Sequence, residues 1–173
     1  MDRLFRSIDA SILAYFRIAF GALMLWEMLR FYFLGRMKWN WIHPDFHFTY
    51  LGFEWVSPLA GNGLQWVVAI LAVAAIGVMI GFLYRVAALV FAVGITYLFL
   101  LDQTEYMNHF YLMCLLAWIA VVLPANACAS VDALMRPGLR SEVVPAWTLL
   151  VLRFQLGIVY VYGGLAKLNG DWL

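Results

Sequence analysis

Hydrophobic and polar positions in this chain alternate in long blocks, not with the short period of a soluble helix or strand. Five apolar runs, bounded by polar or turn-forming residues, occupy residues 12–34, 64–83, 86–101, 106–123 and 144–165. A helix needs about 20 apolar residues to cross a bilayer, and several runs approach that length. The pattern predicts an all-α, polytopic transmembrane helix bundle of about five spans, with the short third run tilted or partly interfacial.

Composition supports the membrane class. Hydrophobic residues make up 66% of the chain and charged residues 12%, and the mean hydropathy is +0.88, values outside the range of soluble globular domains. The lipid bilayer is therefore the first expected partner. The net charge of +1 comes without a basic patch, so no nucleic-acid partner is expected. No signal-peptide cleavage site made of small residues is evident after Met1 to Asp9, so no removable signal peptide is predicted. The first helix is expected to act as its own insertion signal.

The distribution of Lys and Arg predicts the orientation. One side of the predicted bundle carries five arginines and the other carries Arg36 and Lys38, and basic residues favour the cytoplasmic side. The five arginines are Arg3, Arg6, Arg85, Arg136 and Arg140. The N-terminus is therefore expected in the cytoplasm, with the Asp102–Glu105 turn and Lys167 on the extracytoplasmic side.

Polar residues in the last apolar run share one helix face. Arg153, Tyr160 and Lys167 are spaced by seven residues, nearly two helical turns, and the resulting stripe is expected to face the bundle interior. Gly163 and Gly164 lie beside the stripe, where they allow either close helix packing or the approach of a flat ligand. Lys167 is open to two interpretations: an amine that extends to the interface, or a functional ionisable group.

The fourth run begins with Asn108 and His109, at the depth expected for Lys167. A bundle could bring this amide, imidazole and amine into one pocket, apolar below and open to water above, where titration behaviour is often altered. The alternative for His109 is a hydrogen-bonded packing residue. Asp102, in the preceding turn, could equally be a solvated acid.

Further charges lie in the first apolar run. Glu27 and Arg30 are three residues apart and are expected to pair, whereas Arg17 has no local acid and needs a partner from another helix or a water-filled cavity. We expect Arg17 to be structural.

The sequence favours no metal site. His43 and His47 flank Asp45, but Pro44 argues against one continuous helix through them. The surrounding aromatic residues are typical of an interfacial belt. Two cysteines, Cys114 and Cys128, are expected to be free.

Several separated segments together resemble the vitamin K-dependent gamma-glutamyl carboxylases and their bacterial relatives, whose membrane part is called the horizontally transferred transmembrane domain. The segments are Phe16-Arg-Ile-Ala-Phe-Gly21, Gly81-Phe-Leu-Tyr-Arg85, Phe99-Leu-Leu-Asp-Gln-Thr104, Asn108-His109, Tyr111-Leu112, Ser130-Val-Asp132, Val144-Pro-Ala-Trp147, Leu152-Arg153 and Gly164-Leu-Ala-Lys-Leu-Asn-Gly-Asp-Trp172. They occur in the family's order across nearly the whole chain. Residues 1–173 are accordingly expected to be the N-terminal part of such a domain and a fragment of a larger bundle.

The resemblance implies an enzyme that oxidises reduced vitamin K with O2 to the epoxide and uses the product base to carboxylate glutamate with CO2. A lysine matching Lys167 is the base in that family, and residues matching Asn108 and His109 line the quinone site, near the acid matching Asp102. Tyr160, Gly163 and Gly164 are further candidates for contact with the quinone, and Arg153 is a supporting candidate. The chain departs from the animal enzymes at Tyr106-Met107, where they have Trp-Asn, and at Ala166, where they have a second lysine.

Three functions therefore remain open from the sequence. They are a carboxylase acting on a glutamyl peptide or protein, a quinol epoxidase that fixes no CO2, and a non-catalytic membrane module that binds lipid or partner proteins. The second differs from the first only in the fate of the base.

Overall fold

The computed structural model describes residues 3–168 except residues 36 and 45. Its elements in order are β1 (Ser7–Asp9), α1 (Ser11–Phe33), a π-helical turn η1 (Lys38–Ile42), α2 (Gly63–Ile80), α3 (Tyr84–Leu100), a 3-10 turn η2 (Gln103–Glu105), α4 (Asn108–Val122), α5 (Val131–Met135), a 3-10 turn η3 (Pro137–Leu139), β2 (Val143–Pro145) and α6 (Trp147–Ala166). The predicted all-α bundle is confirmed as a mostly helical fold, to which β1 and β2 add one short antiparallel pair.

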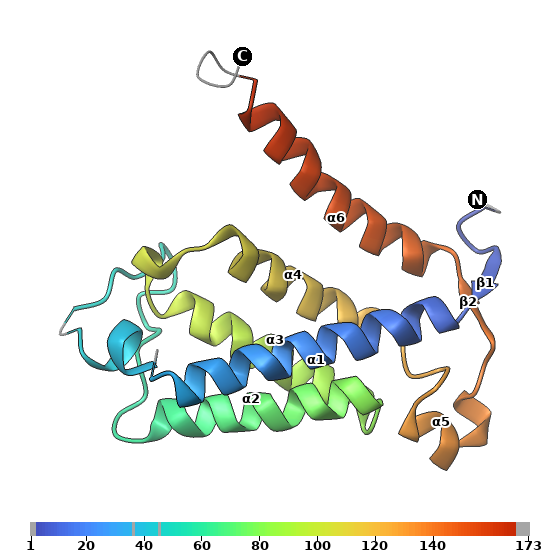
Figure 1. Cartoon of the computed structure of the whole chain (residues 1–173), viewed down its shortest axis with the longest axis horizontal. Coiled ribbons are helices and arrows are strands. Elements are labelled where there is room, and N and C mark those ends of the chain that lie inside the picture. The colour runs from blue at the N-terminus through green and yellow to red at the C-terminus, as the bar shows by residue number, and fades with distance from the viewer. Residues whose placement is uncertain (1–2, 36, 45, 169–173) are drawn as a thin grey trace.

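Helices α1 to α4 lie roughly along one direction and enclose the core (Figure 1). α1 packs on α2, α2 on α3 and α3 on α4. Gly21 of α1 permits the first of these contacts, because a Cβ built there would lie 2.7 Å from the Cα of Met79. Small residues allow close approach of membrane helices in this way.

Three described helices are long and apolar enough to cross a membrane, namely α1, α2 and α6. α3 and α4 are apolar but shorter, at 17 and 15 residues. The five predicted apolar runs thus all become helices within a few residues of the expected bounds. Five membrane crossings, however, are not established by length and composition.

The connections between helices define two ends of the bundle. At one end β1 pairs with β2, and the backbone N–H of Asp132 donates to the carbonyl of Gly81 at 2.9 Å. This end, called the arginine-rich end, holds the segments that carry Arg3, Arg6, Arg85, Arg136 and Arg140. The opposite end, called the η2 end, holds η1, the loop of residues 43–62 and the turn from α3 to α4 (Figure 1). The sequence grouped the same segments, whereas Arg36 lies outside the described residues.

Arg17 joins α1 to the arginine-rich end. Arg17 is 1% exposed, and its guanidinium donates to the carbonyls of Val78 and Met79 at the end of α2 and of Ala125 and Ala129 in the segment between α4 and α5. The prediction that Arg17 finds partners outside its own helix is confirmed. The predicted pair of Glu27 and Arg30 is also present, at 2.6 Å.

α6 behaves differently from the other long helices. Its start contacts α1 and α4, but the helix then diverges from them along its length (Figure 1). Only 6% of the residues in its most apolar stretch are buried within the protein. The apolar surface of α6 that the described residues leave uncovered is stable only against lipid or against another packing partner.

Candidate functional site

Asp102 is the central polar residue of the connection between α3 and α4. This residue caps η2: its Oδ1 accepts hydrogen bonds from the backbone N–H of Thr104 at 2.9 Å and from the Thr104 hydroxyl at 2.7 Å. The side chain is buried, with Asp102 only 4% exposed. The interpretation of Asp102 as a simple solvated acid is therefore wrong.

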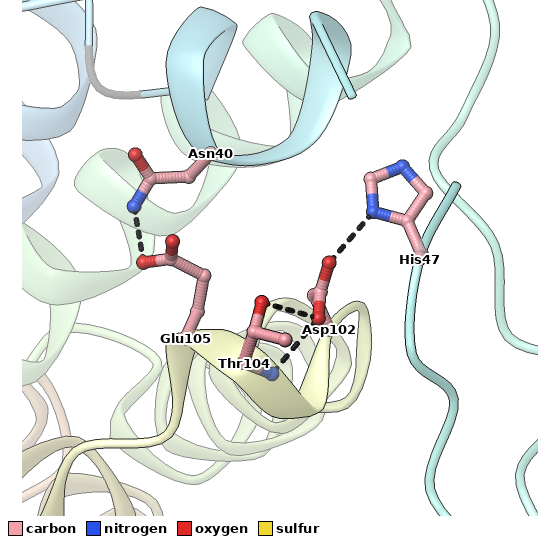
Figure 2. A network of polar contacts seen from close by, with 5 residues as sticks. All are labelled: Asn40, His47, Asp102, Thr104 and Glu105. Atoms are coloured by element: carbon pink, nitrogen blue, oxygen red, sulfur yellow. Dashed lines mark hydrogen bonds and ion pairs between the residues drawn. The ribbon is translucent and has the colours of Figure 1, made fainter. Parts of the chain in front are cut away.

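His47 approaches the same carboxylate from the loop that follows η1. Its Nδ1 lies 3.1 Å from Asp102 Oδ2 (Figure 2). Burial acts to raise the pKa of the Asp102 carboxyl, but the hydrogen bonds from Thr104 and the contact with His47 outweigh it and hold this pKa below 3.8. The carboxylate is thus poised to orient the imidazole, a common role for an acid beside a histidine.

A second contact ties the same segments together. Asn40 donates from Nδ2 to Glu105 Oε2 at 2.5 Å, beside the Asp102 pair in Figure 2. The N–H of Gln103 also donates to the carbonyl of Phe48 at 2.7 Å. These contacts hold η1 and the segment of Phe48 against η2.

Asn108 and His109 are the first two residues of α4, and both are exposed. His109 lines a small pocket between α1 and α4, together with Glu27, Arg30 and Phe31. The pocket has a volume of about 80 Å³, whereas sites for small molecules usually measure about 300–1,000 Å³. In this arrangement the pocket is too small to accept a naphthoquinone ring.

The predicted residues of α6 do not face the bundle. Arg153, Tyr160, Gly163, Gly164 and Lys167 are all exposed, Tyr160 at 81%. A Cβ at Gly163 or Gly164 would meet nothing within 4 Å. The expectation that this polar stripe faces the interior is not met, because among the described residues the buried positions of α6, Thr148 and Leu152, lie near its start.

The structure therefore brings together one part of the predicted site and leaves the other apart. Asp102, Asn108 and His109 lie at the η2 end, where α4 begins. Lys167 follows the last residue of α6, and that end of α6 stands clear of α4 in Figure 1. Residues Asn169, Gly170, Asp171 and Trp172 of the resembling segment lie outside the described residues.

Comparison with known families decides the classification. The sequence matches the HTTM domain over residues 5–173. The chain belongs to the HTTM domain family. No solved structure matches it.

The HTTM domain is the one found in vitamin K-dependent gamma-carboxylases, so the resemblance seen in the sequence is confirmed at the level of the domain. Its match, together with the apolar helices, marks the chain as a membrane protein. The match covers the segments that carry Asp102, Asn108, His109 and Lys167. It assigns no reaction to them.

Sequence reasoning missed the partnership of His47 with Asp102. His47 was considered only with His43 and Asp45, and Asp45 lies outside the described residues. Within the described part of the chain, no three His, Cys, Asp or Glu side chains are placed to hold a metal ion. The only sequence signal for the true contact was that the loop of His47 and the turn of Asp102 were expected at the same end of the bundle.

Proposed function

We propose that this HTTM protein is an integral membrane enzyme that oxidises a hydroquinone, such as reduced vitamin K, with O2. The products are the epoxide and water, which balance one hydroquinone and one O2. The observation that supports this best is the placement of Asn108, His109 and Asp102 at the end of the bundle toward which α6 runs.

The direction of α6 supports a role for Lys167 at the η2 end. α6 begins at the arginine-rich end, next to β2, and its 20 residues span about 30 Å at 1.5 Å per residue. Helices α1 and α3 run in the same direction along the bundle and finish at the η2 end (Figure 1). In this proposal, a lateral movement of α6 brings Lys167 toward His109.

In the catalytic arrangement, the far half of α6 packs over the face between α1 and α4. This movement covers the small pocket beside His109 and enlarges it into an enclosed site, with the stripe of α6 as its new wall. Gly163 and Gly164 suit the contact because they present no side chain to a flat ring or to a neighbouring helix. Tyr160 and Arg153, now exposed, would turn toward the bundle one and two heptads from Lys167.

The residues then have separate tasks. Lys167 accepts a phenolic proton at Nζ, a task that an always-charged arginine cannot perform. Asn108 and His109 donate hydrogen bonds to the oxyanion that develops on the substrate. Stabilisation of developing charge by preorganised donors is usually the largest single contribution to catalysis. Apolar walls from Phe31 and Phe110 exclude water, which would quench a strong base.

Asp102 and His47 have a positioning role in this proposal. The carboxylate is a positioning group for His47 and for the turn that leads into Asn108, and it contacts no substrate. The proposal also adopts the predicted topology: five crossings, the N-terminus in the cytoplasm and the catalytic end extracytoplasmic. Coupling to carboxylation of a glutamyl substrate with CO2 is the further step that the family suggests.

The test is epoxide formation by the full-length protein in lipid nanodiscs supplied with vitamin K hydroquinone and O2. Wild type should form epoxide. Lys167→Ala should lower the rate by about 10²–10⁴-fold, the usual contribution of a general base, and His109→Ala by about 10²–10³-fold, the usual cost of losing one oxyanion donor. Lys38→Ala is the matched control, because Lys38 is the other lysine of the sequence, and it should keep the wild-type rate. Absence of epoxide from wild type would instead favour a non-catalytic membrane module.

Carboxylation is tested separately with a glutamyl peptide and labelled bicarbonate. Label in the peptide, dependent on hydroquinone, identifies a carboxylase. Epoxide without label identifies an epoxidase that fixes no CO2.

A further inference from the structure

A second pocket lies at the arginine-rich end, opposite the site discussed above. It has a volume of about 340 Å³ and lies between the start of α3 and the segment around α5. Arg85, Arg136 and Asn126 line it, together with Asp132. Both arginines are exposed at this pocket.

The pocket carries more positive than negative charge, because two arginines and one aspartate line it. Asp132 accepts from the backbone N–H groups of Leu83 at 2.8 Å and Tyr84 at 3.0 Å, and from Asn126 Nδ2 at 3.0 Å. Its single negative charge thus caps the start of α3, and the pocket is also lined by the two arginines. Arg85 donates one N–H to the carbonyl of Val121, and a guanidinium has five N–H donors in total. An arginine side chain can bind the oxygens of a phosphate with two parallel N–H donors.

An apolar groove continues from this pocket. Leu83 and Val86 line both the arginine pocket and a groove of about 440 Å³ between α2 and α3. The groove is walled by Trp66, Val73 and Phe82 and is nearly free of polar atoms. Ile70 and Val90 then connect it to a third cavity of about 740 Å³ further along the same two helices. A charged pocket that opens into a long apolar groove has the shape of a lipid.

We propose that Arg85 and Arg136 bind the phosphate headgroup of an anionic phospholipid whose acyl chain lies in the groove between α2 and α3. The position supports this occupant, since α3 begins at Tyr84, where the apolar run meets the polar end of the bundle. Arginines at such interfaces attract anionic lipids with about 1 kcal/mol each, or roughly fivefold in affinity. A free phosphate would gain nothing from the groove. This site is independent of the proposed oxidation chemistry.

The experiment uses the full-length protein in detergent and measures binding of dioleoyl phosphatidylglycerol by native mass spectrometry. Dioleoyl phosphatidylcholine, with identical chains and no net charge, should bind more weakly, and glycerol 3-phosphate should not compete at equal concentration. Arg136→Gln should weaken phosphatidylglycerol binding about fivefold. Arg140→Gln is the matched control, because Arg140 lies at the same end but lines a different pocket, and it should bind as wild type does.

The groove is tested by substitution at the junction of the two cavities. Val86→Trp should fill the passage and reduce binding of both lipids, whereas Val122→Trp, at another exposed apolar position, should not. Equal losses in Arg136→Gln and Arg140→Gln would overturn the headgroup assignment. Equal binding of the two lipids, or effective competition by glycerol 3-phosphate, would also overturn the proposal.

Discussion

Replacement of Arg17 by methionine tests the joint that holds α1, α2 and the segment after α4 together. The guanidinium reaches Ala125 O from Nε at 3.0 Å, Val78 O and Met79 O from Nη1 at 3.2 and 2.5 Å, and Ala129 O from Nη2 at 2.5 Å. Methionine keeps much of the apolar stem but removes every donor. The carbonyl of Met79, near the end of α2, then loses this donor, whereas the carbonyl of Val78 retains the backbone N–H of Gly81.

The expected loss follows from these four hydrogen bonds. A buried hydrogen bond contributes about 1 kcal/mol net, and a bond to a charged group contributes more. Methionine also avoids the cost of burying a guanidinium, so the lower figure applies, and four bonds give about 4 kcal/mol. In a chain of 173 residues, 1 kcal/mol corresponds to a change of about 2–4 °C in Tm. Arg17→Met should therefore melt roughly 8–16 °C below wild type.

Thermal unfolding of the purified protein in one detergent provides the measurement. Arg17→Lys should fall between wild type and Arg17→Met, because an ammonium has three donors and cannot span four carbonyls. Arg153→Met makes the same change at an exposed position of α6 and should stay within about 0.5 kcal/mol of wild type. If Arg17→Met and Arg153→Met melt together, the four-carbonyl joint does not stabilise the fold and the reasoning is refuted.

Two further predictions concern the packing of α1 and the loop over the site. Gly21→Ala should lower the unfolding free energy by about 1–3 kcal/mol, because its Cβ would lie 2.7 Å from the Met79 backbone. Gly157→Ala, which has open space around it, should not lower the Tm in the same melting assay. Equal Tm values for the two variants would contradict the close approach of α1 and α2. Because the folded pKa of Asp102 lies below 3.8, its contacts stabilise the loop above that pH and are lost as the pH falls through the lower, folded value. Hydrogen exchange at the Gln103 amide, corrected for its intrinsic rate, should therefore accelerate at acid pH in wild type and be fast at every pH in Asp102→Asn; an unchanged rate in that variant would exclude the link.

Much of the helical fold could be predicted because membrane helices correspond to long runs of apolar residues in the sequence. The run 12–34 became α1 at Ser11–Phe33, and the run 64–83 became α2 at Gly63–Ile80. The ends of the bundle were also predictable, since successive antiparallel helices alternate in direction. α5 and the β1–β2 pair were missed because five and three residues carry too little periodic pattern to stand out.

The candidate site was less predictable because it depends on contacts between distant segments. Sequence spacing places Asn108 and His109 on one helical turn, but it cannot show that His47, 55 positions before Asp102, meets that carboxylate. Helical periodicity likewise gave α6 a polar stripe without fixing the direction in which the stripe points. That direction is set by packing, and α6 packs little against the described chain.

The most direct test of the account is the proximity of Lys167 to His109 in a lipid membrane. In a Cys114→Ala, Cys128→Ser background, cysteines replace Lys167 and His109, and a short bis-maleimide reports whether the two positions meet. Packed helices have axes about 8–10 Å apart, so the account predicts efficient cross-linking when α6 covers the face between α1 and α4. Cysteines at positions 167 and 85, at opposite ends of the bundle, should remain unlinked. Failure of the 167–109 pair to cross-link in membranes, with both thiols reactive, would contradict a shared site.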